Sequence, residues 1–282
     1  MFKLSPRNKC ALIALLLGML PTVAMGAEET APTAEELDAW VEMGKRYYHG
    51  DGNIIAVDKE KSLEYFSLAA EHNVPEALYY LGTQYYQGEG MALPNEDKGE
   101  ALYREAAKGG NPDAQMVMGV IHILEAASMN PRDPAAKLEL EKAATFLKPA
   151  AETGHAEAQF WYGDMLVKGS GVEKDEARGI TLIQQSAEAG NANGLAMLGV
   201  YYWLGTGLEK DPVKAYQYLL LSQRAGNENA EMVMARMLTP ITEEQKKEAI
   251  AFADTWEIEH GNLGRDEAPG MAEKLMRQLQ GR

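Results

Sequence analysis

The sequence predicts an all-α fold: a solenoid of about five stacked helical hairpins, closed by capping helices at its C-terminal end. Three observations predict it. A glycine motif recurs at intervals of 38, 37, 44 and 36 residues, with its glycines at Gly44, Gly82, Gly119, Gly163 and Gly199. A cationic motif follows each copy in register, and both halves of each unit carry helix signals. One hairpin cannot bury its apolar face alone, so the hairpins are expected to stack.

Residues 1–26 are predicted to be a secretory signal peptide. Three cations precede an apolar run at 11–20, which is too short to span a bilayer. Small residues in Ala24-Met25-Gly26 predict cleavage after Gly26, and an uncut N-terminal anchor is the alternative. The one cysteine, Cys10, precedes the apolar run, so no lipoprotein signal is expected. The sequence therefore predicts a periplasmic or secreted protein.

A short linker, 27–36, is expected before the solenoid, 37–238, in which the first half of each unit is a helix. In the second copy Ala77, Leu81 and Tyr85 form an apolar stripe. A glycine inside a helix costs about 1 kcal/mol relative to alanine, so its recurrence predicts close approach of the paired helix. A Gly-x-Gly turn ends four of these helices, at 50–52, 88–90, 169–171 and 205–207. A phosphate-binding loop is the alternative, but such loops open a helix rather than end it.

The second half of each unit is predicted to be a helix of about 14 residues with marked ends. A cation begins it in register, at Lys61, Lys98, Lys142, Arg178 or Lys214. Three residues earlier, four copies have a typical N-cap: Asp58, Asn95, Asp175 or Asp211. Twelve residues after the cation stands a residue suited to a left-handed C-terminal cap: Asn73, Gly110, Gly154, Gly190 or Gly226. A lysine at the third helical position opposes the helix dipole, which predicts a carboxylate neighbour.

The third copy departs most from this pattern. It lacks the Gly-x-Gly turn and has a longer spacer between its two halves. Asp133 and Pro134 are expected to start an extended second helix, which Pro149 should kink. An insertion of this kind can mark a binding face or be neutral.

Residues 239–282 are predicted to cap the exposed end of the solenoid. Thr242 and Gln245 form a capping box for a helix that runs to about Ile258. A last amphipathic helix is expected over 270–280. A dimerising or tail-like segment is the alternative.

The combined motif resembles the Sel-one-like repeat, a relative of the tetratricopeptide repeat, over roughly 38–238. In the second copy its positions are Ala77, Leu81, Gly82, Tyr85, Gly88, Gly90, Asn95, Lys98, Ala106, Ala107, Gly110, Asn111 and Ala114. The resemblance implies a right-handed α/α superhelix with a concave face that binds proteins. It also implies several bacterial roles: an envelope-assembly scaffold, an adaptor at the host interface, or an immunity partner that sequesters a toxic secreted lipase.

The geometry of the related tetratricopeptide repeat implies that the first helix of each hairpin lines the concave face. The residue three after each repeat glycine is then expected in the core: Tyr47, Tyr85, His122, Leu166 and Tyr202. The candidates for binding a partner are mostly aromatic: Tyr48, Tyr79, Thr83, Tyr86, Phe160, Asp164 and Trp203. Tyrosine and tryptophan are typical interface hot spots. The alternative is that neighbouring helices cover these side chains.

The sequence predicts no catalytic residue, no cofactor and no metal ligand. It has no H-E-x-x-H, G-x-S-x-G or S-x-x-K motif after residue 26. Its five histidines are scattered, and His122 falls in the core tyrosine position. Zinc–thiolate sites need cysteine, which the mature chain lacks. The paired cysteines of family members linked to β-lactam or peptidoglycan-fragment binding are absent as well.

The acidic charge narrows the choice of partner. The net charge of −15 becomes −18 (−15 − 3) when the signal peptide is removed, which argues against nucleic acid and anionic membranes. No later apolar stretch is long enough to span a membrane. We therefore expect a monomeric exported module, without enzymatic activity, that binds another protein or peptide. The alternative is an enzyme or binder acting on cell-wall fragments or β-lactams.

Overall fold

The computed structural model describes residues 31–52, 54–237 and 241–260. Every regular element in these residues is a helix, and consecutive helices pack as pairs, which confirms the predicted all-α solenoid class. The chain divides into two compact units, 1–109 and 110–282, and the boundary between them falls inside the solenoid predicted over 37–238. None of the described helices is both long and apolar enough to cross a membrane.

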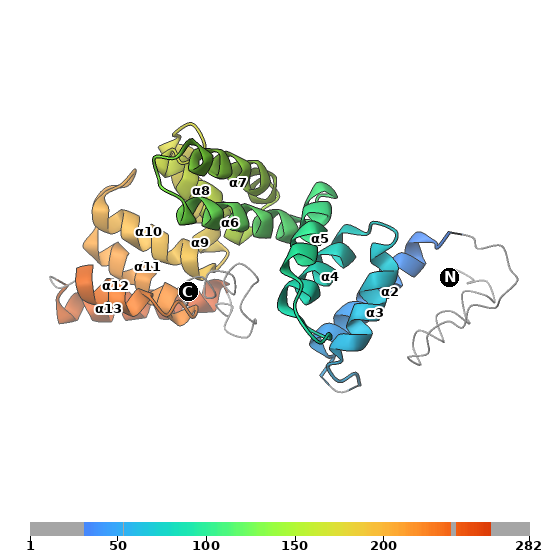
Figure 1. Ribbon diagram of the computed structural model, residues 1–282. Coiled ribbons are helices and arrows are strands. Elements are labelled where there is room, and N and C mark those ends of the chain that lie inside the picture. The colour runs from blue at the N-terminus through green and yellow to red at the C-terminus, as the bar shows by residue number, and fades with distance from the viewer. Residues whose placement is uncertain (1–30, 53, 238–240, 261–282) are drawn as a thin grey trace, which may run out of the picture. The chain divides into compact units, whose positions relative to one another are not determined.

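The first unit contains two hairpins. Its helices, coloured blue to teal in Figure 1, are α2 (Ala34–His49), α3 (Lys59–Ala70), α4 (Pro75–Gln87) and α5 (Glu96–Lys108). Helix α2 packs on α3 and α4 on α5, and the contact between α3 and α4 stacks one hairpin on the other.

The second unit contains three hairpins and two further helices. The hairpins are α6 (Pro112–Ser128) with α7 (Pro134–Glu152), α8 (Ala156–Lys168) with α9 (Glu176–Glu188), and α10 (Ala192–Leu204) with α11 (Pro212–Arg224). Contacts of α7 with α8 and of α9 with α10 stack them in chain order. Two further helices, α12 (Ala230–Met237) and α13 (Glu243–His260), both pack on α11.

The repeat glycine allows the two helices of each hairpin to approach closely, as predicted. A Cβ atom built on Gly163 would lie 2.8 Å from the backbone oxygen of Gly179 and 2.9 Å from Cγ1 of Ile183. The glycines of the other four copies also meet the second helix of their own hairpin. The residues opposite are fully buried and stand five positions after the cation in every copy: Phe66, Tyr103, Leu147, Ile183 and Leu219. This pairing accounts for the glycine despite its helix propensity.

The predicted helix ends are confirmed. Each expected N-cap residue accepts a backbone hydrogen bond in the first turn of its helix, as Asp211 does from Val213 and Lys214. All five predicted C-terminal residues, Asn73 included, have a positive φ. Both glycines of each Gly-x-Gly turn also have a positive φ. The four glycine pairs therefore end helices, as expected of a turn.

The third hairpin has the extended second helix that the sequence predicts. Helix α7 has 19 residues, against 12 or 13 in the second helices of the other hairpins, and Asp133 caps it. Pro149 lies in its last turn, and the helix continues through it to Glu152. A kink at Pro149 stays a prediction.

The ends of the described chain bring one correction. The first helix begins at Ala34, inside the linker expected over 27–36, because Thr33 and Glu36 form a capping box that opens the helix early. The capping box of Thr242 and Gln245 is present and opens α13. The predicted signal peptide, 1–26, and the helix expected over 270–280 lie outside the described residues.

Helix α13 covers apolar side chains of the last hairpin, as expected of a cap. Its residues Ala253 and Trp256 belong to one buried cluster with Tyr201 and Leu221. Arg224, near the end of α11, pairs with Asp254 at 2.8 Å and with Glu257 at 3.2 Å.

The turn after α2 contains an acid-sensitive contact. Asp51 pairs with Arg46 and accepts hydrogen bonds from the backbone N–H groups of Ile54 (2.9 Å) and Ile55 (2.6 Å). The hydrogen bond from Arg46 is the largest cause, and those from the two backbone N–H groups add to it; together they lower the pKa of Asp51 from 3.8 to about 2. Because the folded pKa is the lower one, this stabilisation is present above pH 3.8 and is lost as the pH falls through about 2. An NMR titration of the Asp51 carboxyl should have its midpoint near 2, and a midpoint at 3.8 would contradict the contact.

Candidate functional site

In three of the five hairpins, a tyrosine stands three residues after the repeat glycine and a cation lies over its ring. Lys98 Nζ is 3.8 Å from the centroid of Tyr85, and the pairs Lys61–Tyr47 and Lys214–Tyr202 are each separated by 5.2 Å. The negative face of the ring stabilises a cation at a helix start, where the helix dipole is unfavourable. These tyrosines therefore have a structural role. Tyr47 is buried as predicted, whereas Tyr85 and Tyr202 are half-buried.

Tyr48 on α2 is half-buried and held on several sides. Its ring lies 5.5 Å from that of Tyr80 and 6.4 Å from that of Phe66, and Lys59 Nζ is 3.0 Å from its centroid. Burial, together with a hydrogen bond to Glu89, raises the pKa of Tyr48 far above its ordinary value. The phenol therefore stays neutral at physiological pH, and the residue remains partly exposed.

Helix α4 separates its three candidate residues. Thr83 is buried: its hydroxyl donates to the backbone oxygen of Tyr79 (3.1 Å) and accepts from the hydroxyl of Tyr103 (3.0 Å). The surface position expected for Thr83 is therefore wrong, because the side chain serves the contact between α4 and α5. Tyr79 and Tyr86 are half-buried, with their rings 5.8 and 6.2 Å from that of Tyr103.

These rings form a continuous aromatic cluster in the first unit, made up of Tyr48, Tyr79, Tyr80, Tyr86 and Tyr103. Tyr80, which is not one of the predicted candidates, lies 5.5 Å from Tyr48 and 5.3 Å from Tyr79 and so connects them. It also stacks on the buried Phe66 at 4.7 Å. The other copies have unlike residues at its position, Glu42, Val117, Trp161 and Met197, so the repeat pattern contained no signal for it.

In the second unit, the candidates on α8 are held inside the fold. Phe160 is only 7% exposed, so its expected place on a surface is wrong; its ring packs against Trp161 at 4.8 Å. Asp164 accepts a hydrogen bond from the Tyr201 hydroxyl (2.8 Å) and pairs with Lys168 (2.7 Å). Burial, and then the negative charge of Asp164, raise the pKa of Tyr201 well above its ordinary value. Asp164 thus links α8 to α10.

Trp203 on α10 is half-buried. It packs against a buried cluster that contains Ala215, Leu219 and Ile241, and Lys210 Nζ lies 5.3 Å from its ring. Four of the seven candidates therefore belong to the first unit and three to the second. Partner binding by the half-buried aromatic residues stays a prediction.

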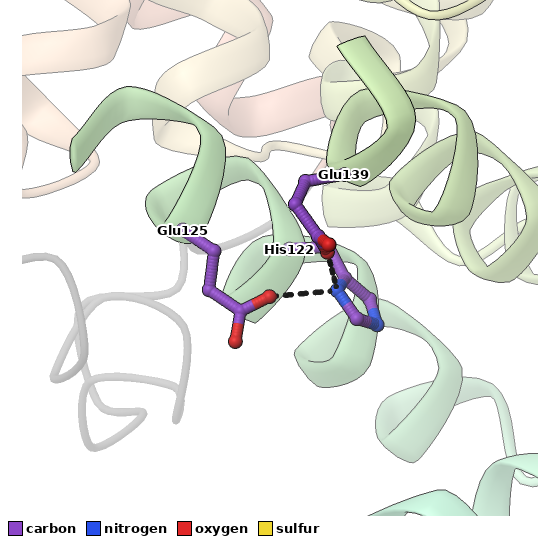
Figure 2. Close-up of side chains that lie close together, drawn as sticks. All are labelled: His122, Glu125 and Glu139. Atoms are coloured by element: carbon purple, nitrogen blue, oxygen red, sulfur yellow. Dashed lines mark hydrogen bonds and ion pairs between the residues drawn. The ribbon is translucent and has the colours of Figure 1, made fainter. Parts of the chain in front are cut away.

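A second group of polar side chains was not predicted. His122 of α6 lies between two carboxylates, with Nδ1 at 2.9 Å from Glu125 Oε2 and 2.8 Å from Glu139 Oε2 (Figure 2). Glu139 comes from α7 and pairs through its other oxygen with Lys142 at 2.7 Å. The Lys142 hydrogen bond is the main cause that lowers the pKa of Glu139 to about 2. The His-x-x-Glu spacing on α6 is visible in the sequence, but the third member depends on how α6 and α7 pack.

Comparison with known proteins identifies the repeat. The family model described as the Sel1 repeat matches residues 40–74, 75–111, 156–191 and 192–227, which together cover more than half of the chain. The chain belongs to the Sel1 repeat family. Sel1 repeats form a protein-interaction fold. The hairpin of α6 and α7 lies between the matched Sel1 repeats, in agreement with its divergent sequence.

Solved structures share this Sel1 repeat fold. A Sel1 repeat protein from Oxalobacter formigenes is 24% identical, with a TM-score of 0.59 over 88% of this chain and 96% of that one. A protective antigen of uropathogenic Escherichia coli with an SLR fold is also 24% identical, with a TM-score of 0.53; the match covers 86% of this chain and 56% of the antigen. Likenesses at this identity establish the fold alone.

Proposed function

We propose that this Sel1 repeat protein binds a protein or peptide partner, and that the aromatic cluster of the first unit provides the contact surface. The observation that carries the proposal is that Tyr48, Tyr79 and Tyr86 are only half-buried, although each ring is fixed by its neighbours. A tyrosine held in place loses little conformational entropy when a partner covers it, which is one reason why tyrosines dominate interface hot spots.

The chemistry of the surroundings favours a basic partner. The chain has a net charge of −15, and its acidic residues outnumber its basic ones by 42 to 27. A partner with lysine or arginine side chains would be attracted over a distance, and its cations could pack on the tyrosine rings. Binding should therefore weaken as the salt concentration rises, since exposed charges are screened.

We also propose that the protein acts outside the cytoplasm, after cleavage of residues 1–26. The support is the order of cations, apolar run and small residues at the N-terminus. N-terminal sequencing of the protein recovered from the periplasmic or secreted fraction should begin at Ala27. A start at Met1, with the protein held in the membrane fraction, would favour an uncut anchor.

Tyr86→Ala should weaken partner binding by about tenfold or more, because it removes a ring from the aromatic cluster. The substitution keeps the Cβ atom that packs against Gly99, so the contact between α4 and α5 is preserved there. The partner would first be captured from an exported-protein extract by the wild-type chain and identified by mass spectrometry. Its affinity for both chains would then be measured by isothermal titration calorimetry.

The matched control is Tyr216→Ala, which removes a half-buried tyrosine from α11 in the second unit. We expect near wild-type affinity for this variant, and circular dichroism would check that both variants are folded. Equal affinity of the wild-type chain and a folded triple variant at Tyr48, Tyr79 and Tyr86 would refute the proposed surface.

A further inference from the structure

The group formed by His122, Glu125 and Glu139 has more acceptors than hydrogen atoms to share. An imidazole Nδ1 carries at most one hydrogen, yet two carboxylate oxygens lie within 2.9 Å of it. One N–H cannot form a full hydrogen bond to both at once. Two carboxylates that face one nitrogen also repel each other unless a cation lies between them.

Lys142, which pairs with Glu139, does not lie between the carboxylates of Glu125 and Glu139. Lys142 pairs with Oε1 of Glu139, whereas Oε2 of the same carboxylate points towards His122 (Figure 2). The ligand atoms of the three side chains all lie within 4.8 Å of one another. An ion of small radius could therefore be bound by one nitrogen and two oxygens after small side-chain movements.

The three side chains are supported on rigid elements. His122 and Glu125 are three residues apart on α6 and so share one face of the helix. Helices α6 and α7 approach closely at Gly119, where an added Cβ would lie 2.4 Å from Leu147 Cγ. The His122 ring stacks on Phe146 at 5.6 Å, and the side chains of His122 and Glu139 are 10% and 12% exposed. Such a partly desolvated and preorganised set of donors is suited to binding a metal ion.

The position of His122 within the repeat also sets this group apart from the other hairpins. In the other hairpins the residue three after the repeat glycine is often a tyrosine under a cation, as in the Lys98–Tyr85 pair. In the third hairpin this residue is His122, and the equivalent cation, Lys142, forms an ion pair with Glu139 instead of lying over a ring. This hairpin also lacks the Gly-x-Gly turn.

We propose that His122, Glu125 and Glu139 bind a divalent transition metal ion, with Zn²⁺ the best match. One imidazole nitrogen with two carboxylate oxygens is a donor set that Zn²⁺ accepts, and water would fill the fourth position. The imidazole disfavours Ca²⁺ and Mg²⁺, which prefer oxygen ligands alone. The ion would join α6 to α7 in the hairpin that lacks the glycine turn. This inference does not depend on the proposed partner surface.

Calorimetric titration of the chelator-treated full chain with Zn²⁺ tests the proposal. We expect one site, with affinity reduced by about tenfold or more in His122→Asn and in Glu125→Gln. The same two variants should lose the visible absorption bands of bound Co²⁺. Lys142→Met should bind Zn²⁺ more tightly, because it removes the cation that competes for Glu139.

The matched control is His155→Asn. His155 also contacts a carboxylate, Asp113 at 3.2 Å, but it has no third ligand in the described part of the chain, and asparagine keeps its role as the N-cap of α8. This variant should bind Zn²⁺ as the wild type does. Glu125 is the most exposed of the three side chains, at 44%, so Glu125→Gln should fold even if His122→Asn does not. Unchanged Zn²⁺ affinity in a folded Glu125→Gln variant, or no Zn²⁺ binding by the wild type, would overturn the proposal in favour of a histidine–carboxylate ion pair.

Discussion

Gly163→Val should destabilise the second unit by roughly 3 kcal/mol, the upper part of the range for overpacked interiors. The Cβ atom alone would lie 2.8 Å from the backbone oxygen of Gly179. A backbone oxygen cannot rotate away as a side chain can, so α8 and α9 would have to separate. Valine has only a slightly better helix propensity than glycine, and that gain is too small to offset the clash. Chemical denaturation followed by circular dichroism would measure the loss.

Ala177→Val is the control for this substitution. It places the same β-branched side chain on the exposed face of α9, where space is available. We expect a change within about 0.5 kcal/mol for this surface position. If both variants unfolded at the same denaturant concentration, close helix approach would not be the reason for the repeat glycine.

Gly90→Ala should lower the free energy of unfolding clearly more than Gly52→Ala does. Both glycines end a Gly-x-Gly turn and have a positive φ, of 74° and 80°. Alanine in that conformation costs about 1–2 kcal/mol at either position. A Cβ at Gly90 would also lie 2.5 Å from the backbone oxygen of Lys59 in the preceding hairpin, whereas no described atom lies within 4 Å of a Cβ at Gly52.

The comparison of these two variants separates backbone strain from packing between hairpins. Urea denaturation would measure the free energy of unfolding of both variants. Gly90→Ala should lower it by about 1–3 kcal/mol more than Gly52→Ala does, because only Gly90→Ala adds a packing clash. Equal losses would mean that the second glycine of the turn serves backbone conformation alone. Where a hairpin precedes the turn, this contact explains the second glycine, since Gly90 lies against Lys59, Gly171 against Leu140 and Gly207 against Ile180.

The fold could be predicted from the sequence because each of its signals is local and repeated. The N-cap residues, the positive-φ residues and the two-glycine turns specify helix ends within a few positions of the chain. The Thr242–Gln245 capping box is an example, since its two hydrogen bonds join residues three apart. The Thr33–Glu36 capping box has the same spacing and is open to the same reasoning, although a linker was expected in its place.

The candidate site was less predictable, because position in a repeat does not determine exposure. Thr83 and Asp164 follow a repeat glycine directly, but the first is buried beneath Tyr103 and the second accepts a hydrogen bond from Tyr201. Tyr80 joins the aromatic cluster through neighbours on other helices. Each outcome depends on the residue opposite, which differs between hairpins.

From the sequence alone it follows that this chain is a series of helical hairpins, where most helices of the repeats begin and end, and which glycine faces the paired helix. Which tyrosines remain partly exposed, and that Glu139 of α7 meets His122 and Glu125 of α6, became visible only when the helices were seen packed. The physical reason is range. Caps and turns are formed by residues a few positions apart, whereas exposure and ligand geometry arise from side chains that are distant in sequence and meet only when helices pack.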